Sequence, residues 1–426
     1  MSAHFDVAIV GAGPAGSAAA ILLARAGWSV ALVERQRFPR RKVCGECIAA
    51  SNLALLDALG VGTEVEHLAG AELRRVALMR GTASVIAPLP PADAPGRRFG
   101  RALGREQLDT LLVRQAALAG ATLFQPCALQ AIEGEAGSFR LRLRAAGEGG
   151  AETTIEAALV VAAHGSWEPL PSERAVRREQ RRPSDLFAFK ANFRRIAIEP
   201  DLLPVLAFAG GYGGMVVADD GIATLAGCIR EDRLGRDREA NPGERAGDVF
   251  EAILRRECAG VADALQGAER EGPWLATGPI RPGVRLGQGD GIFRIGNAAG
   301  EAHPIVGEGI SMAIQSAFVL AAVLLPERLR LVAQASAADV QAKLLRDYET
   351  RWRQRFTPRL RVAAAFAHLA MRPWAAAAAW PVVRAWPGLL THGARWSGKT
   401  RTVPEAAQLI GPGGDSVNGP LAAFGR

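Results

Sequence analysis

The chain has 426 residues and a mass of 44.9 kDa, more than one small domain needs, so we expect two or three packed units. Apolar residues make up 49% and charged residues 22%, which excludes a disordered chain and a repetitive fibre. The five cysteines lack framework spacing, and no apolar leader precedes the first strand. We therefore expect a cytoplasmic protein in a reducing compartment.

The first elements in chain order predict a βαβ unit. Residues 5–10 form a continuous apolar run, which is typical of a buried parallel strand. Residues 17–26 are rich in Ala and Leu and are followed by a glycine, which predicts a helix. Residues 29–33 predict a second buried strand, and Glu34 follows it directly.

Three glycines at dinucleotide-binding spacing lie between the first strand and the helix. Gly11 permits the tight turn, Gly13 lets a pyrophosphate approach the backbone, and Gly16 allows close packing of helix on strand. The helix N-terminus supplies N–H groups and positive dipole to the phosphates. Glu34 lies eighteen residues after the last glycine, where an acid accepts hydrogen bonds from a ribose. The unit therefore predicts a dinucleotide site rather than a turn chosen only for packing.

The hydrophobic pattern of the sequence changes twice along the rest of the chain. Period-2 alternation over 184–230 predicts an antiparallel sheet, and we expect the strand-like residues 72–89 to join it. Buried-strand character returns at 291–300, before a helix over 309–324. The C-terminal part is predicted to be helical over 338–397, with interruptions at four prolines, and the tail after 402 to be loose. Further predicted elements are a helix over 105–119 and strands over 138–145 and 153–162; the four prolines are Pro358, Pro373, Pro381 and Pro387.

A second glycine-rich segment indicates which dinucleotide binds. Ile295-Gly-Asn297-Ala-Ala-Gly, continuing through His303-Pro304 to Gly307-Glu-Gly309-Ile310, resembles a flavin-binding segment of FAD-dependent monooxygenases and geranylgeranyl reductases. In those families an Asp at the position of Asn297 bonds the ribityl chain, and the helix start directs N–H groups at the pyrimidine end of the flavin. The resemblance implies FAD, held by Gly11, Gly13, Ala15, Gly16, Glu34, Arg35, Cys44, Gly45, Arg105, Asn297, Gly307, Gly309 and Ile310.

The resemblance and the order of elements together predict an α/β fold. A Rossmann-like FAD-binding domain is interrupted by an antiparallel-sheet substrate domain, and a helical region follows. The expected FAD-binding domain is discontinuous, with residues 1–71, 100–180 and 276–330; the substrate domain has residues 72–99 and 181–275, and the helical C-terminal region has residues 331–426.

The segment Phe38-Pro-Arg-Arg-Lys-Val-Cys44-Gly45-Glu46-Cys47 resembles a stretch in the same superfamily where a Cys lies beside the flavin. Small Gly45 would let the backbone approach the ring. Cys44 and Cys47 are candidate catalytic residues, because Cys-x-x-Cys spacing can form a disulfide or tune a thiolate. The alternative is that both are packing residues. No second Cys/His pair has ligand spacing, so no metal site is expected.

The expected substrate region gives weaker signals. Tyr212, one of two tyrosines, is a candidate pocket residue or a half-buried sheet residue, and Pro304 is a second candidate. The Trp-x-Trp-x-Ile-Pro pattern of flavin-dependent halogenases is absent, and so is the Trp/Tyr-rich pattern of prenyl reductases. His164 stands where aromatic hydroxylases carry an Asp-Gly pair; it either changes the handling of NADPH or caps a strand end.

The resemblance implies an oxidoreductase in which FAD carries the chemistry. The first hypothesis is an NAD(P)H- and O₂-dependent monooxygenase that hydroxylates an apolar aromatic or polyketide-like small molecule. The alternative is reduction of isoprenoid double bonds, as in geranylgeranyl reductases. A minor alternative is an escort protein that binds a prenyl or lipid group without redox chemistry.

The region 351–401 carries a marked charge asymmetry within a chain of net charge +8. It holds ten Lys or Arg, no acid and five of the eight tryptophans. No nucleic-acid-binding motif accompanies this charge, so no nucleic-acid partner is expected. Trp and Arg together suit a water–lipid boundary, which predicts peripheral membrane contact. The alternative is that the tryptophans pack onto the FAD-binding domain.

Overall fold

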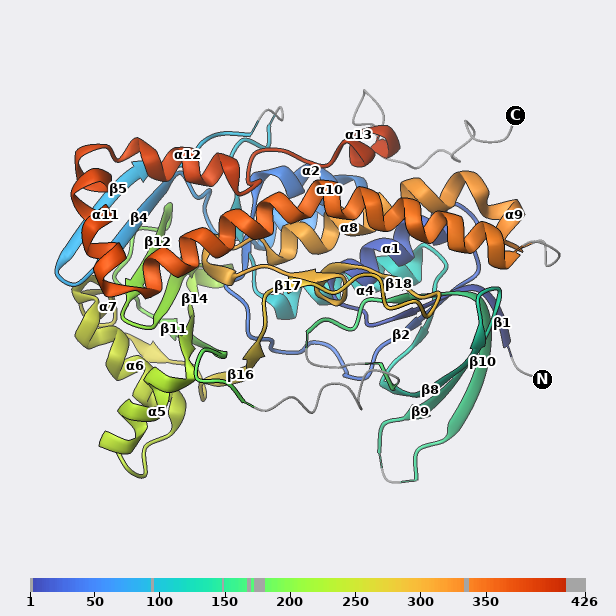
Figure 1. The fold of residues 1–426 in the computed structure, drawn as a ribbon, viewed down its shortest axis with the longest axis horizontal. Coiled ribbons are helices and arrows are strands. Elements are labelled where there is room, and N and C mark those ends of the chain that lie inside the picture. Colours follow the sequence, from blue (N-terminus) through green and yellow to red (C-terminus); the bar gives the residue numbers. More distant parts are fainter. Residues whose placement is uncertain are drawn as a thin grey trace.

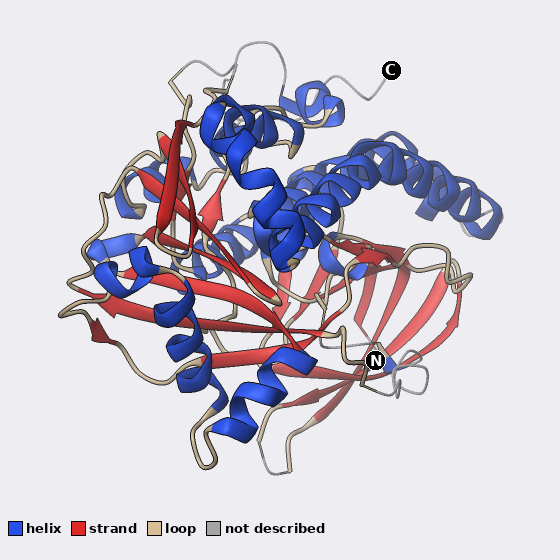
Figure 2. Ribbon diagram, turned by 60° about the vertical axis from the view of Figure 1, so that its left-hand side comes forward, coloured by secondary structure: helices blue, strands red, loops and turns tan. Residues whose placement is uncertain are grey.

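A computed structural model describes residues 3–92, 96–147, 149–166, 170–171, 181–332 and 337–410. It contains two large sheets side by side with a helical layer across them (Figures 1 and 2). The α/β fold class predicted from the sequence is confirmed. Residues 411–426, part of the tail that was expected to be loose, lie outside the described residues.

The first sheet carries the predicted βαβ unit. Its parallel part has the order β7-β2-β1-β10, with β18 also parallel to β10, and β9 and β8 continue it as an antiparallel ladder. The strands are β1 (Ala3–Val10), β2 (Val30–Val33), β7 (Thr122–Phe124), β8 (Cys127–Glu135), β9 (Ser138–Ala145), β10 (Glu152–Ala162) and β18 (Phe293–Arg294).

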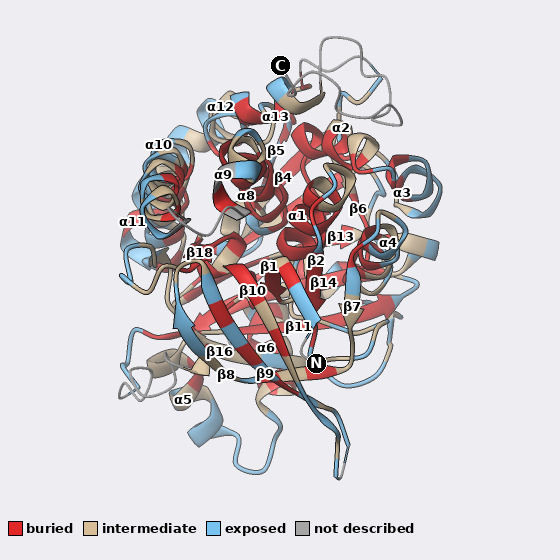
Figure 3. Ribbon diagram, turned by 90° about the vertical axis from the view of Figure 1, so that its right-hand side faces the viewer, coloured by how far each residue is buried: buried red, intermediate tan, exposed pale blue. Residues whose placement is uncertain are grey.

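Helices α1 (Pro14–Arg25), α4 (Arg105–Leu118) and α8 (Gly309–Leu324) pack on one face of this sheet, with α2 (Ala50–Ala58) and α3 (Gly62–Leu68) beside them. Figure 3 shows the buried residues concentrated in α1, α8 and the strands beneath them. The first helix starts at Pro14 rather than at residue 17, because Gly13 is its N-cap and proline is favoured in a first turn.

The second sheet has the order β15-β11-β14-β13-β12-β4-β5, with β16 also paired to β11. It is antiparallel except for β12 and β4, which run parallel. Residues 72–89 do join this sheet, as expected, and the predicted domain boundary at 275/276 falls inside β16. The strands are β4 (Arg75–Arg80), β5 (Ala83–Pro88), β11 (Leu186–Arg194), β12 (Leu202–Phe208), β13 (Gly211–Val217), β14 (Ala223–Arg230), β15 (Glu269–Arg270) and β16 (Leu275–Ile280).

Both faces of the second sheet are covered. Helices α6 (Ala246–Glu257) and α7 (Ala259–Ala264) bury the face that carries Phe189 and Phe193, and α5 (Glu231–Ala240) lies beside them. The opposite face points toward the first sheet and toward the C-terminal helices. Two short pairs complete the described strands: β3 (Cys47–Ile48) with β6 (Arg101–Ala102), and β17 (Gly283–Val284) with β19 (Gly300–Glu301).

The C-terminal region is helical but differs from the prediction at two prolines. Helix α10 (Ala337–Met371) runs through Pro358, and α11 (Pro373–Ala385) runs through Pro381. A proline removes one helical hydrogen bond, and the burial of α10 along α8 outweighs that loss. The other helices are α9 (Arg328–Val332), α12 (Gly388–Trp396) and α13 (Pro404–Ile410), and α13 replaces the loose chain expected after residue 402.

Helix α10 spans the two sheets (Figure 1). Its first half is anchored on the FAD-binding side, where Tyr348 donates a hydrogen bond of 2.6 Å to the carbonyl of Arg294 and Trp352 is buried. One described helix, extending over 309–327, is apolar and long enough to cross a membrane by composition, and 72% of its most apolar window is buried inside the protein. A core helix passes the same criterion.

Candidate flavin and substrate site

A cavity of about 380 Å³ lies where the two sheets and the C-terminal helices meet. Its first part is lined by glycine-rich backbone from Gly13, Gly45, Gly307 and Gly309. Its second part, here called the aliphatic chamber, is lined by aliphatic side chains of the second sheet and of helices α10 to α12. These include Val76, Leu78, Leu203, Val205, Met215, Val216, Leu369, Val383, Leu389 and Leu390.

The glycines of the first motif serve two different purposes. Gly11 has a φ of +106°, and a Cβ there would lie 2.5 Å from the Ala163 carbonyl oxygen; a Cβ on Gly16 would lie 1.9 Å from the Gly11 oxygen. These two glycines are required by the chain's own packing. Gly13 differs, since its φ is −70° and the nearest atom to a Cβ would be an Arg105 nitrogen at 3.8 Å.

Gly45 and Gly309 repeat the pattern of Gly13. A Cβ at either position would meet no atom within 4 Å, and neither has a positive φ. Nothing in the protein itself therefore demands glycine at these three cavity positions. A ligand that lies against the backbone would require glycine at these positions. FAD fits this glycine-lined part of the cavity, here called the cradle: Gly13 opens α1 for the pyrophosphate and Gly309 opens α8 for the flavin end.

Glu34 follows β2 directly, as predicted, and lies beside the turn. Its Oε2 accepts a hydrogen bond of 3.0 Å from the Ala12 N–H, and its Oε1 accepts one of 2.8 Å from the Gln36 N–H. Arg40 pairs with it at 3.6 Å. These bonds hold the buried carboxylate at the strand end, where a ribose would meet it. Arg35 is exposed and does not line the cavity.

The N-terminus of α8 carries a buried charged cluster that sequence reasoning missed. Glu308 is the N-cap residue, and its carboxylate lies 4.0 Å from Lys399 Nζ and 3.9 Å from Arg359. Burial raises the pKa of Glu308, against the pull of both cations. Lys399 lines the cavity and reaches within 3.5 Å of a Cβ position on Gly307. The two cations outnumber the single Glu308 carboxylate, and together with the helix dipole they make this end of the cavity attractive to negative charge.

Asn297 lines the cavity where the resembling families carry Asp. Its Nδ2 donates to Ser166 Oγ at 2.9 Å and to Glu301 Oε1 at 3.4 Å. An Asp here would place a second carboxylate against buried Glu301, so asparagine is the electrostatically consistent choice. Glu301 also pairs with Arg285 at 2.6 Å.

Cys44 and Cys47 both line the cavity, and all five cysteines are free thiols. Cys44 is half-buried, and its Sγ accepts a hydrogen bond of 3.4 Å from the Glu46 N–H. Cys47 is buried in β3, and burial raises the pKa of its thiol, which disfavours the reactive thiolate. The geometry therefore supports a packing role more strongly than a redox role.

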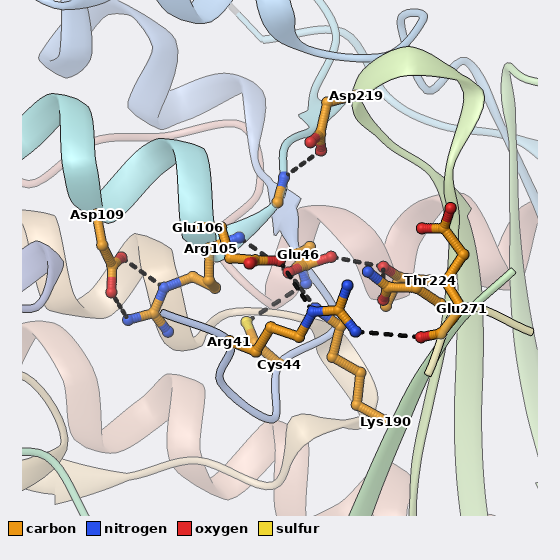
Figure 4. Close-up of polar contacts among 12 residues, drawn as sticks. Arg41, Cys44, Glu46, Arg105, Glu106, Asp109, Lys190, Asp219, Thr224 and Glu271 are labelled. Carbon is orange, nitrogen blue, oxygen red and sulfur yellow. Dashed lines mark hydrogen bonds and ion pairs between the residues drawn. The ribbon is translucent and has the colours of Figure 1, made fainter. Parts of the chain in front are cut away.

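A buried polar cluster next to Cys44 joins the two sheets (Figure 4). Glu46 accepts hydrogen bonds from Lys190, from Thr224 Oγ1 at 2.5 Å and from the Arg105 N–H at 2.9 Å. Glu46 and Lys190 are each 2% exposed. Glu46 also has a φ of +57°, a backbone conformation that a non-glycine residue adopts at a cost of about 1–3 kcal/mol. The cluster therefore holds the 44–47 loop against the second sheet.

Arg105 is buried at the start of α4, and its guanidinium makes two hydrogen bonds of 2.7 Å to Asp109. Arg105 lines the cavity and lies beside Gly13. The pair thus presents an oriented guanidinium to the pyrophosphate side of the cradle.

Tyr212 and Pro304 both line the cavity. His303, the residue before Pro304, forms a polar pair with Tyr212. The Tyr212 hydroxyl lies 3.2 Å from His303 Nδ1. Burial lowers the pKa of His303 to about 4, with a smaller electrostatic contribution from His368. Burial raises the pKa of the Tyr212 hydroxyl well above its ordinary value of 10. Both side chains are therefore neutral near pH 7. Sequence reasoning identified Tyr212 but missed His303, because a lone histidine before a proline carries no signal of its own.

We expect the acid stability of the protein to depend on His303. Its imidazole stays neutral in the folded state down to about pH 4, whereas the unfolded chain binds a proton below about pH 6.5. The free energy of unfolding should therefore fall by about 3 kcal/mol as the pH drops through this window. His303→Asn should remove most of this dependence, measured by urea unfolding at several pH values. An unchanged pH dependence in the variant would contradict the assignment.

We expect Cys44 to act through packing. Cys44→Ser should retain stoichiometric flavin and keep the flavin-dependent activity within about threefold of the wild type, because the substitution conserves shape. Thiol titration of the unreduced, denatured protein should count all five cysteines as free. A loss of activity of about tenfold or more with flavin retained would instead indicate a redox or substrate-contacting thiol.

The fold and the cradle fit a flavin-binding protein, and comparison with known proteins agrees. Residues 4–355 match a family model described as FAD binding domain, so the chain belongs to this family and is an FAD-dependent oxidoreductase. Digeranylgeranylglycerophospholipid reductase 2 of Methanopyrus kandleri is 27% identical over 83% of both chains.

Two other relatives match over shorter stretches. Menaquinone reductase of Mycobacterium tuberculosis is 38% identical over 28% of both chains, so the match spans less than a third of that relative. 6-Methylpretetramide 4-monooxygenase of Streptomyces rimosus is 52% identical over 14% of both chains.

Solved structures show the same fold at low identity. A geranylgeranyl bacteriochlorophyll reductase-like protein from Thermoplasma acidophilum has a TM-score of 0.71 at 17% identity, and each chain covers 96% of the other. A flavin-dependent brominase has a TM-score of 0.72 at 16% identity, over 95% of this chain and 97% of the other. At these identities the likeness extends to the fold alone.

Proposed function

We propose that this chain is a monooxygenase that hydroxylates an apolar aromatic substrate. NAD(P)H supplies two electrons, one oxygen atom of O₂ enters the substrate in place of hydrogen, and the other leaves as water. FAD would supply the redox chemistry at the cradle. Gly13, Arg105 and Glu34 would hold its pyrophosphate and ribose, and Gly45 and Gly309 would leave room for its ring.

The protein's own contribution at the flavin end is electrostatic. The N-terminus of α8 and Lys399 present positive charge at the cavity, which favours a cofactor that gains negative charge when reduced. The aliphatic chamber excludes water from the reacting end of the substrate.

The observation that carries the proposal is the Tyr212–His303 pair at the edge of an aliphatic chamber. A neutral phenol and a neutral imidazole can bind one hydroxyl or carbonyl group without introducing a charge. This suits an apolar ring that bears a hydroxyl group better than an unbroken isoprenoid hydrocarbon. A site built to bond such a group discriminates strongly against analogues that lack it.

A second candidate, reduction of isoprenoid double bonds, is favoured by one observation. The M. kandleri relative named a digeranylgeranylglycerophospholipid reductase matches 83% of both chains, whereas the relative named a monooxygenase matches 14%. In this reaction the two electrons and two protons would go to the two carbons of the double bond, and O₂ would not be consumed.

Oxygen dependence separates the two functions. NADH and NADPH oxidation should be measured with long-chain alkylphenols and with geranylgeranyl compounds, in air and under anaerobic conditions. The proposal predicts substrate-stimulated oxidation and a hydroxylated product only in air. Turnover that persists without oxygen and yields a saturated chain would establish the second candidate.

Tyr212→Phe provides a residue-level test of the same proposal. It removes the hydroxyl and keeps the ring, so kcat/KM for a hydroxylated substrate should fall by about 10- to 100-fold with FAD content unchanged. An unaltered kcat/KM would remove the pair from substrate recognition.

A further inference from the structure

The sequence allowed two interpretations of the five tryptophans in the region 351–401, membrane contact or packing onto the FAD-binding domain. Some of the tryptophans fit the first interpretation and others the second. Trp352 is buried against the FAD-binding side, and Trp380 lines the cavity. Trp374, Trp386 and Trp396 are instead 72%, 56% and 65% exposed. Packing thus explains two of the tryptophans, and the remaining three are exposed on α11, on α12 and between these two helices.

Helix α11 is apolar on both faces. Its inner face lines the cavity through Ala376, Ala379, Trp380 and Val383, and its outer face exposes Val382 (56%). Arg384 is the single charged residue among the thirteen of the helix. A helix that faces solvent on one side normally carries charged residues there, and a helix apolar all round belongs in a core or a membrane environment.

The exposed tryptophans are not all isolated residues, since Trp386 and Trp396 share one aromatic patch. The His392 ring lies between two of them, with ring centroids 5.9 Å from Trp386 and 6.3 Å from Trp396. An exposed apolar patch of this kind marks an interaction surface.

The charge around this patch is of one sign. Arg372, Arg384 and Arg395 are exposed, and no described carboxylate pairs with any of them. By contrast, Arg351, Arg353 and Arg355 of α10 pair with Asp347, Glu349 and Glu405. Exposed arginines without a described carboxylate partner therefore lie beside the exposed tryptophans, and within the same region Arg361 and Arg401 are exposed in the same way.

We propose that the outer face of α11 and α12 is a docking surface for an anionic lipid bilayer, through which an apolar substrate reaches the cavity. Indole rings favour the headgroup level, and arginine side chains extend from there to lipid phosphates. The aliphatic chamber lies directly beneath, because the same two helices line it. The docking surface is inferred from these observations alone. Only the delivery of substrate through it depends on the proposed function.

Vesicle co-sedimentation of the FAD-loaded full chain tests the surface without any turnover. Binding to phosphatidylcholine vesicles should require added phosphatidylglycerol and should weaken at least tenfold between about 0.05 M and about 0.5 M salt. The triple variant Arg372→Gln, Arg384→Gln, Arg395→Gln should bind at least tenfold more weakly. The variant Trp374→Ser, Trp386→Ser, Trp396→Ser should lose binding at low salt as well.

A matched control removes three exposed arginines elsewhere. Arg144 on β9 and Arg236 and Arg238 on α5 lie away from α11 and α12 (Figure 1), and their change to Gln should leave vesicle binding unaltered. FAD absorbance of each purified variant, recorded before vesicles are added, confirms that it is folded.

Three outcomes would overturn the proposal: no binding to anionic vesicles, binding that both patch variants retain, or self-association in solution that the tryptophan variant abolishes. The last would show that a second copy of the chain covers the patch. None of these bears on the chemistry, since failure of the proposed function would appear as absent turnover on detergent-dispersed substrate.

Discussion

Gly13→Val should abolish FAD binding and yield a folded, colourless protein. The backbone of Gly13 is compatible with valine, and a Cβ there would meet only the end of the Arg105 side chain at 3.8 Å. The branched side chain would instead occupy the space in which the pyrophosphate approaches the backbone. Flavin content per chain from the visible spectrum, with circular dichroism as the folding check, measures the effect.

The matched control for this substitution is Gly235→Val. Gly235 lies in α5 without a positive φ, and a Cβ there would meet no atom within 4 Å, but the residue does not line the cavity. This variant should keep stoichiometric FAD. Full flavin content in Gly13→Val would show that the cradle has been wrongly placed.

Glu46→Ala should lower the stability of the protein by about 3–5 kcal/mol, because it leaves the buried Lys190 ammonium without its partner. It also removes acceptors for Thr224 and for the Arg105 N–H. Since these bonds hold the loop that carries Cys44 and Gly45, the affinity for FAD should fall too. Chemical unfolding and FAD titration measure the two effects.

The control lies in the same view. Glu106 pairs with Arg41 at 3.3 Å, but both side chains are more than a third exposed, so Glu106→Ala should cost at most about 1 kcal/mol (Figure 4). The double variant Glu46→Leu with Lys190→Met should recover much of the stability, since an apolar pair replaces a buried ion pair. Equal effects of Glu46→Ala and Glu106→Ala would refute the assignment of a structural role to the cluster.

Local patterns were sufficient for the parts of the fold that depend on neighbours in sequence. The glycine spacing predicted the turn at Gly11 and the cradle at Gly13 because both are properties of one short segment. The period-2 alternation over 184–230 predicted the second sheet in the same way. The segment 295–310 carried the flavin assignment through its resemblance.

What the sequence did not reveal depends on contacts between distant segments. Glu46 and Lys190 meet only because the 44–47 loop packs on β11, and the alternation of β11 would place Lys190 in solvent. His303 gains a role only beside Tyr212, ninety-one positions away. The path of α10 through Pro358 is likewise decided by its packing along α8, which a local proline rule does not include.

Binding of FAD in the glycine-lined cavity, and its use for redox chemistry, can be tested directly. The most direct measurement is the visible spectrum of the purified protein, with identification of the chromophore released on denaturation. We predict a flavin spectrum, one FAD per chain, and bleaching on anaerobic reduction. A colourless protein that takes up no FAD on incubation, or one that releases a different chromophore, would contradict the account.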